Sequence, residues 1–332
     1  MSYVSIENSE SFLKCFEVMA EDKSCIVTDS VLYFSGKSGK GFMAVAGVST
    51  GIEVLAINAS NLTEDLAFSF LPSRGASSYI LCFDDISQPG RLESDLPFAN
   101  GGIPGDRHNS SVSIADASYG KLVSYPKEKT IRALIVRVQK SSMGHLIDDF
   151  DAGAIQSILQ SHNNTSVSWP ITFKYRLLLN DFMADIVQHP FRELFTIRNV
   201  SILVEFLLQQ FFVMERLSKE GNYLSTQDTV NLSKVEHHLC SNYKLEFPGI
   251  EKLSRISAMS PTSLKTKFKK YYGETLFGYY QKNKLEHARK LLDNKVPVKV
   301  VATEIGYSNP SHFTLAFKKE YGFSPWHYLI PH

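Results

Sequence analysis

The sequence has few cysteines and no long apolar run. Its 332 residues include four cysteines, which are too far apart for a C-x-x-C pair and have no matching pair of histidines. This spacing argues against a structural zinc site and against a disulfide framework. We expect Cys15, Cys25, Cys82 and Cys240 to be small, buried apolar side chains. The most apolar segment, residues 202–213, is too short to cross a bilayer and contains a glutamate, so no membrane association is expected.

The sequence also lacks targeting and catalytic signatures. Its N-terminus has no basic segment followed by an apolar stretch, so we expect a cytoplasmic protein. The chain contains no nucleotide-binding glycine loop, no Ser-His-Asp signature and no H-E-x-x-H run. The strand-rich part offers only His108 and, just beyond it, His145 as nitrogen ligands, which disfavours a metal site. We therefore expect a protein that is not an enzyme and that has no cofactor and no metal.

Charge is divided unequally along the chain. The formal net charge of the whole is +1, but residues 231–332 contain 16 Lys and Arg against 8 Asp and Glu. The net charge is therefore +8 in this last third and −7 in the remainder. A basic region attracts a polyanion through the release of counterions, whereas an acidic region is repelled from it. DNA is therefore expected to contact only the C-terminal third.

One pattern occurs twice in that third, at residues 250–273 and 298–322. Each copy is a short amphipathic helix, a turn with a small residue, and a second helix with a basic flank. The second helices begin after Ser260 and Asn309, which are good N-cap residues, and each starts with a proline, where no hydrogen bond is lost. Two such units in one domain indicate helix-turn-helix motifs that bind the major groove of DNA.

The two copies correspond residue by residue. Ala258 aligns with Gly306 in the turn, and Gly273 aligns with Gly322 after the second helix. The apolar residues of the second helices recur at helical spacing, so we expect them on one buried face. They are Leu264, Phe268, Tyr271, Phe313, Phe317 and Tyr321.

The opposite face of each second helix consists mainly of short hydroxyl side chains and lysines, which suit contacts with base edges and phosphates. The predicted DNA-binding residues are Thr262, Ser263, Lys265, Thr266, Lys269, Lys270, Asn309, Ser311, His312, Thr314, Leu315, Lys318 and Lys319. A solvated face on an ordinary helix hairpin would explain one isolated copy equally well. Two copies joined by one helix favour DNA binding.

The joining helix is expected at residues 276–293, with Leu285, Ala288, Leu291 and Leu292 on its apolar side. A helix of about 18 residues is about 27 Å long at 1.5 Å per residue. Successive major-groove faces on one side of B-DNA lie about 34 Å apart. A rigid helix of this length, with the packing width at each end, can hold two recognition helices one turn of DNA apart.

On these residues the chain from about 231 to 330 resembles the DNA-binding domain of the AraC/XylS family of bacterial transcription regulators. The most specific motifs are Ile305-Gly306-Tyr307, Ser311-His312-Phe313, Phe317-Lys318-Lys319, Tyr321-Gly322 and Ser324-Pro325. The sequence departs from the family pattern at Lys284, where arginine is usual, and at Ala258, where glycine is frequent. The resemblance implies an activator or repressor that contacts two adjacent major grooves, usually with a second domain for effector binding or dimerisation.

The N-terminal part has the pattern of short strands separated by turns rich in Gly, Asn, Ser and Pro. The predicted strands are 25–34, 41–48, 52–57, 66–70, 79–83, 112–117, 121–125 and 131–138. About eight strands at this spacing predict a β-rich barrel or sandwich in which residues 88–109 are expected to be a long loop. A helix at 11–20 packs beside it. Members of the family that the C-terminal part resembles often have a cupin-like barrel in this position. For this chain the cupin-like fold is an analogy only.

Helical spacing follows, with helices predicted at 154–161, 170–188 and 192–219. The last of these is apolar around most of its circumference, so it needs a second burial partner, either the neighbouring helix or another subunit of a homodimer. The predicted organisation is therefore α+β. A β-rich putative effector domain spans 1–144, a helical connector or dimerisation region spans 145–220, a linker spans 221–230, and the DNA-binding domain spans 231–332.

The sequence thus predicts a transcription regulator that binds double-stranded DNA through recognition helices at about 261–271 and 310–321. Its expected partners are a small-molecule effector, RNA polymerase and a second copy of the chain. Two alternatives stay open: a small-molecule-processing β-barrel tethered to DNA, and a regulator whose N-terminal domain only mediates protein contacts. The effector site itself is unknown; the candidates to line one are Arg74, Arg107, Arg132, Tyr33, Tyr79, Tyr119 and Tyr125.

Overall fold

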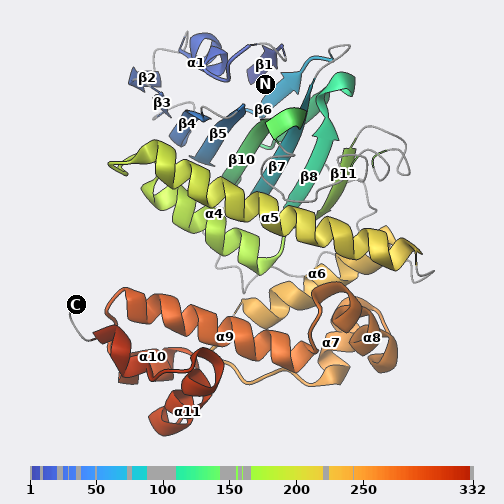
Figure 1. Cartoon of the computed structure of the whole chain (residues 1–332), viewed down its shortest axis with the longest axis vertical. Coiled ribbons are helices and arrows are strands. Elements are labelled where there is room, and N and C mark those ends of the chain that lie inside the picture. The colour runs from blue at the N-terminus through green and yellow to red at the C-terminus, as the bar shows by residue number, and fades with distance from the viewer. Residues whose placement is uncertain are drawn as a thin grey trace. The chain divides into compact units, whose positions relative to one another are not determined.

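The chain folds into two units, one within residues 1–222 and the other within residues 223–332, which we call unit 1 and unit 2 (Figure 1). The computed structural model describes residues 2–7, 10–20, 25–28, 30–34, 39–48, 51–72, 77–87, 110–142, 155, 159, 166–219, 224–241 and 243–329. The predicted loop at 88–109, most of the predicted helix at 154–161, and Arg74, Arg107, His108 and His145 lie outside these residues. No helix in the described ranges is long and apolar enough to cross a membrane.

Unit 1 contains a large antiparallel sheet and a small mixed sheet. The large sheet has the order β11-β8-β7-β10-β5-β4-β3-β2. Its strands are β2 (Cys25–Thr28), β3 (Val31–Phe34), β4 (Lys40–Val48), β5 (Ile52–Ser60), β7 (Ser78–Ser87), β8 (Ser111–Asp116), β10 (Thr130–Gln139) and β11 (Ser166–Pro170). In the small sheet, β6 (Leu66–Phe70) pairs in parallel with β1 (Ser2–Ile6) and antiparallel with β9 (Lys121–Tyr125).

The large sheet has a hydrophobic core on each face because its central strands are apolar on both sides. Along β10, Ile131 and Ile135 face the core shared with the small sheet and α1 (Lys14–Met19). The alternate residues Leu134 and Val136 face a second core with α4 (Phe173–Asp185) and α5 (Arg192–Lys219). Figure 1 shows these two helices across one face of the sheet, with α1 and β1 on the other side. Unit 1 is therefore a layered α+β structure.

The strand pattern is largely confirmed, with three differences. The predicted run 25–34 is a hairpin of two strands, β2 and β3. The strands β1 and β11 were not predicted, and β11 falls where the sequence suggests the approach to a helix. Of the two alternatives, a barrel and a sandwich, the described strands form layered sheets and no closed barrel: β2 and β11 are the two edges of the large sheet. The cupin-like analogy is not supported by this topology.

The broad apolar surface of α5 is mostly buried inside unit 1. Val200, Leu203, Leu207 and Phe211 are each at most 2% exposed and pack with α4 and the sheet. Among the larger apolar side chains near the exposed face of this helix, Leu194 is 68% exposed and Phe212 is 42% exposed. The neighbouring helix and the sheet therefore provide the burial partner that the sequence required, and the apolar excess no longer argues for a homodimer.

Unit 2 is all-α. Its elements are α6 (Thr226–Cys240), α7 (Ile250–Ser257), α8 (Pro261–Tyr272), α9 (Leu276–Asp293), α10 (Val298–Glu304), α11 (Pro310–Tyr321) and the short 3-10 helix η3 (Pro325–Leu329). The five helices from α7 to α11 confirm the predicted double pattern and its joining helix. α6 begins within the segment expected to be a linker, because Ser225 and Asp228 form a capping box at its N-terminus.

A buried carboxyl group lies between the two sheets of unit 1. Asp84 on β7 is 8% exposed and accepts a hydrogen bond of 2.7 Å from the Tyr125 hydroxyl on β9. Burial raises the pKa of Asp84 from 3.8 to about 6, although the Tyr125 hydrogen bond and the charge of Lys121 act in the opposite direction. Since the folded protein holds this proton more tightly than the unfolded chain, the stability that Asp84 contributes is greatest at low pH and is lost as pH rises through about 6.

We expect Asp84→Asn to stabilise unit 1 at neutral pH, because the amide keeps an acceptor for Tyr125 without a buried charge. The wild-type free energy of unfolding should fall by roughly 1 kcal/mol between pH 5 and pH 7.5 through this group, and the variant should not show that loss. Urea denaturation at the two pH values measures both effects. Asp185→Asn, at an exposed carboxylate, is the control. An identical pH dependence in wild type and Asp84→Asn would contradict the prediction.

Candidate nucleic-acid interface

The two turns between paired helices have the same backbone conformation. Ala258 after α7 has φ of 52°, and Gly306 after α10 has φ of 71°. In the first turn the N–H groups of Ala258 and Met259 donate to the carbonyls of Arg255 and Ser254. In the second, the N–H groups of Gly306 and Tyr307 donate to Thr303 and Ala302 in the same pattern. Both turns are thus Schellman motifs that direct the chain into the second helix, which confirms the predicted alignment.

The second helices of the two helix-turn-helix motifs, α8 and α11, also begin in the same way. The Ser260 hydroxyl accepts a hydrogen bond of 3.3 Å from the Ser263 N–H at the start of α8. At the start of α11, the Asn309 side chain accepts one of 2.8 Å from the Ser311 N–H. Asn309, a predicted DNA-binding residue, therefore has a structural role as an N-cap.

The predicted buried faces are confirmed. Leu264, Phe268, Phe313 and Phe317 are fully buried, and Tyr271 is 7% exposed. Tyr321, the last member of the set, is half-buried. The second helices are therefore anchored along one side, which determines the side that is left to solvent.

The thirteen predicted DNA-binding residues lie on the side away from these anchors. Ten are exposed: Thr262, Lys265, Thr266, Lys269, Asn309, Ser311, His312, Leu315, Lys318 and Lys319. Ser263, Lys270 and Thr314 are half-buried, and the Thr314 hydroxyl donates a hydrogen bond of 3.0 Å to the Pro310 carbonyl. The proton of this hydroxyl is therefore already used within α11. The surface position of the set fits a nucleic-acid interface, and its contacts with DNA remain a prediction.

The first helix-turn-helix motif, formed by α7 and α8, is held by α6, which was not predicted to support the interface. Lys267 on α8 forms an ion pair of 2.7 Å with Asp228 on α6. The Tyr279 hydroxyl on α9 donates to the buried Glu236 of α6, also at 2.7 Å. Only a three-dimensional contact reveals these pairs, since their members are far apart in the sequence. Lys267 therefore serves to position α8, unlike the exposed lysines of the same helix.

The second helix-turn-helix motif, formed by α10 and α11, is held by α9. Lys284 on α9 is 7% exposed, and its ammonium lies 3.3 Å from the Tyr280 hydroxyl and 4.8 Å from the centre of the Tyr307 ring. Burial lowers the pKa of this ammonium. Gln281 donates a hydrogen bond to the Tyr307 hydroxyl, so Tyr307, next to the turn at Gly306, is attached to α9 at two points. Lys284, where the resemblance leads one to expect arginine, thus has a structural role inside unit 2.

The C-terminal end of α11 is attached to the same helix. The Tyr321 hydroxyl donates to Glu286 at 3.0 Å, and Arg289 binds the other oxygen of Glu286 at 2.6 Å. The helix α9 has 18 residues, which corresponds to about 27 Å. It is attached to α11 through Glu286, and its length matches the length predicted for the joining helix.

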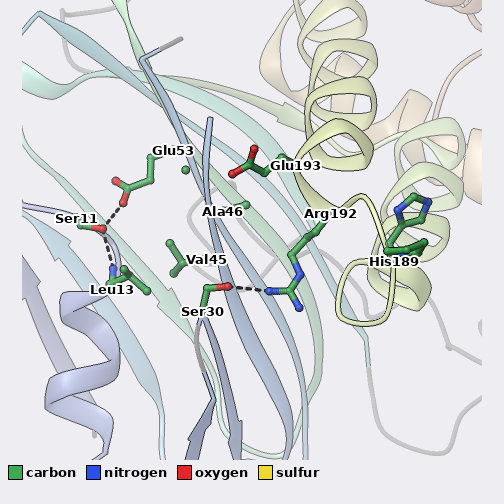
Figure 2. A pocket seen from close by; sticks show the side chains of 11 residues that line it. Ser11, Leu13, Ser30, Val45, Ala46, Glu53, His189, Arg192 and Glu193 are labelled. Carbon is green, nitrogen blue, oxygen red and sulfur yellow. Dashed lines mark hydrogen bonds between the residues drawn. The ribbon is translucent and has the colours of Figure 1, made fainter. Parts of the chain in front are cut away.

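Unit 1 contains a cleft of about 480 Å³ between α1, β4 and the turn that connects α4 with α5 (Figure 2). Arg192 spans it, with hydrogen bonds of 2.8 Å to the Ser30 hydroxyl and 3.0 Å to the Val187 carbonyl. Glu53 binds the Ser11 hydroxyl and forms an ion pair with Arg137. The volume falls in the range typical of small-molecule sites.

The described residues among those suggested for an effector site, Arg132, Tyr33, Tyr79, Tyr119 and Tyr125, do not line this cleft. Arg132 pairs with Asp85 at 3.4 Å, and the Tyr125 hydroxyl is taken up by Asp84. Tyr79 is buried beneath Lys140, whereas Tyr33 and Tyr119 are exposed. Within the described ranges, no group of three or more His, Cys, Asp or Glu side chains is arranged to hold a metal ion. The thiols of Cys15, Cys82 and Cys240 are buried, and Cys25 is half-buried.

Gly306 is the glycine on which the second turn depends. A Cβ at this position would lie 2.4 Å from the Lys244 carbonyl oxygen, whereas a Cβ at Gly322 would meet nothing within 4 Å. Both residues have positive φ, of 71° and 81°. We therefore expect Gly322→Ala to destabilise unit 2 by about 1 kcal/mol through backbone strain alone, and Gly306→Ala by about 3 kcal/mol or more. Urea denaturation of the two variants measures the difference, and equal losses would show that the close approach has no energetic effect.

Comparison with known proteins agrees with this geometry. Residues 253–329 match the family model described as a helix-turn-helix domain. Over 74 residues the chain is 31% identical to the HTH-type transcriptional regulator GlxA of Rhizobium meliloti, which covers 22% of this chain and 23% of that protein. Over 89 residues it is 34% identical to the RCS-specific HTH-type transcriptional activator RclR of Escherichia coli, covering 25% and 31% of the two chains. The similarity thus spans less than a third of these relatives.

A solved structure, the C-terminal domain of AraT, a response regulator from Geobacillus stearothermophilus, is 26% identical. Its match covers 32% of this chain and 85% of that chain, with a TM-score of 0.27. The family match falls on the segment that contains the two helix-turn-helix motifs. Residues 253–329 of this chain are therefore an AraC-type helix-turn-helix domain.

Proposed function

We propose that this protein is a sequence-specific DNA-binding transcription regulator in which α8 and α11 are the recognition helices for two adjacent major grooves. The observation that supports this most is the duplication itself. Two helices with matching Schellman turns, matching N-caps and outward hydroxyl and lysine side chains are joined to one helix, α9. A single solvated helix hairpin would not need this duplication. The net charge of +8 on residues 231–332 gives the segment the sign that a polyanion requires.

The contacts divide by position along each recognition helix. Thr262, Lys265 and Thr266 lie in the N-terminal half of α8, the part that points base-reading side chains into the groove in helix-turn-helix proteins. Ser311 and His312 also lie in the N-terminal half of α11. The paired lysines near the end of each helix are Lys269, Lys270, Lys318 and Lys319. They suit phosphates, which fix the register of the protein on DNA without reading sequence.

For unit 1 we propose control by a small molecule rather than catalysis. The cleft around Arg192 and Ser30 supports this, since it combines several polar groups with the apolar side chains of Val45 and Pro190. An effector regulates DNA binding only if it binds two states of the whole protein with different affinity. Of the alternatives, a domain that only mediates protein contacts would not require this cleft.

The partners in this proposal are double-stranded DNA, a small-molecule effector and RNA polymerase. A homodimer through α5 is not required, because a single chain already presents two recognition helices. The apolar residues that suggested a dimer, including Leu207 and Phe211, are buried within unit 1. A homodimer built on α5 would have to use its more polar exposed side, between Leu194 and Phe212.

Base-reading and phosphate-binding lysines should differ when replaced. We expect Lys265→Ala to lower affinity for the preferred duplex by about 1 to 3 kcal/mol and to relax one base position. Lys319→Ala should weaken binding to all duplexes alike. Site selection on random duplexes, followed by affinity measurements, tests both. Lys127→Ala, an exposed lysine in unit 1, is the control for lost charge. An unchanged motif for Lys265→Ala together with an altered motif for Lys319→Ala would reverse the assignment.

Salt dependence tests the phosphate contacts directly. If the interface neutralises about six phosphates, the slope of log K against log salt concentration should be near −5, at about −0.9 per phosphate. Removal of one phosphate contact, as in Lys318→Ala, should make the slope less negative by about 0.9. Titration of the full chain over a range of salt concentrations measures this, and a flat response would exclude an interface dominated by phosphates.

A further inference from the structure

One side chain on the exposed face of α11 is neither polar nor charged. Leu315 is 67% exposed, one of the most exposed large apolar side chains in the described structure. It has no part in the core, since Phe313 and Phe317 on either side of it in sequence are fully buried on the opposite face. An exposed leucine of this size loses the favourable free energy of burial unless a partner covers it.

The neighbours of Leu315 show where that partner approaches. Ser311 precedes it by one helical turn and Lys318 and Lys319 follow it, and all three are exposed. Thr314, the adjacent residue, directs its hydroxyl proton back to the Pro310 carbonyl. The side chain is thus an apolar point within a polar and basic face, and its partner must be an anionic surface that also presents a small apolar group.

The first helix-turn-helix motif has a different residue at the position of Leu315. In the alignment defined by the shared turns and N-caps, Leu315 corresponds to Thr266 on α8, which is also exposed. Both helices have lysines in the last turn, so the charge pattern is retained. The two recognition helices are therefore alike in how they approach a polyanion and differ in chemistry at one central position.

We propose that Leu315 is a specificity-determining residue that packs against the 5-methyl group of a thymine in the major groove contacted by α11. This inference rests on the proposed function. The thymine methyl is the apolar group that distinguishes one base in the major groove, and it lies on a duplex whose phosphates match Lys318 and Lys319. The groove read by α11 is consequently selected in part by shape and apolar contact, and the groove read by α8 by hydrogen bonds.

Deoxyuridine provides the test, because it lacks this methyl group and keeps every hydrogen-bonding group of thymine. A preferred duplex is first selected from random sequences with the full-length protein, and each thymine is then replaced singly by deoxyuridine. At one thymine in the half-site of α11, wild-type affinity should fall about fourfold, the factor that corresponds to about 0.8 kcal/mol for one buried carbon group. Leu315→Ala should bind the thymine duplex more weakly and show no further loss with deoxyuridine at that position.

Thr266→Ala is the matched control, since it removes the side chain at the corresponding position of the other helix. It should retain the fourfold thymine preference of the wild type in the half-site of α11. Thermal unfolding of Leu315→Ala should be unchanged, because the side chain is outside the core. Failure to select any preferred duplex would contradict the proposed function. Selection of a duplex at which no deoxyuridine lowers affinity, or at which Leu315→Ala retains the full loss, would overturn this inference alone. Unchanged DNA binding by Leu315→Ala would overturn it too and would point to a protein as the partner of this leucine.

Discussion

The helix α9 is the element on which the C-terminal structure depends, because both helix-turn-helix units pack against it. Its buried side chains, Leu276, Tyr280, Leu285, Ala288 and Leu292, run along its whole length. Without this common support, each unit would bury a small core of its own and the two recognition helices would reorient independently. The continuous apolar stripe of one rigid helix converts two weak motifs into a single body that presents two helices at a constant separation.

The two helix-turn-helix motifs are held in place by different contacts. The first is held from outside by α6, through the ion pair of Lys267 with Asp228 and the hydrogen bond of Tyr279 to Glu236. The second is held from within, where Lys284 lies under Tyr307 and Gly306 fits closely against the Lys244 backbone. The two copies of the motif thus have different supports, while the Schellman turn and a side-chain N-cap are common to both.

Sequence reasoning succeeded where structure is determined locally. The caps at Ser260 and Asn309 and the positive φ at Ala258 and Gly306 follow from short-range geometry, so the helices of unit 2 were predicted together with their buried faces. The strands of unit 1 were found by the same kind of pattern. Their arrangement was not, because pairing between distant strands decides whether a sheet closes or ends in an edge.

Contacts between distant residues account for the other differences. The burial of Phe211 on α5 required knowledge of which faces the sheet and α4 present, so an apolar helix could be assigned equally to a core or to a dimer. Lys267 was left out of the predicted DNA-binding face, but its structural role could not be read from the sequence, because its partner Asp228 lies on another helix. The exposed face was predictable as a set, and the task of each lysine within it was not.

The carboxylate of Asp228 joins the beginning of unit 2 to its first recognition helix. One of its oxygens accepts the Ser225 N–H and so caps α6, and the other binds Lys267 on α8. Asp228 therefore connects α6 with α8 close to the point where the chain passes from unit 1 into unit 2. A change that breaks the cap hydrogen bond also disturbs the ion pair of Asp228 with Lys267 on α8. The attachment of α11 to α9 through Tyr321 and Glu286 does not involve Asp228. Under the proposed function, a displacement of the chain at this point would therefore act on the first recognition helix more directly than on the second.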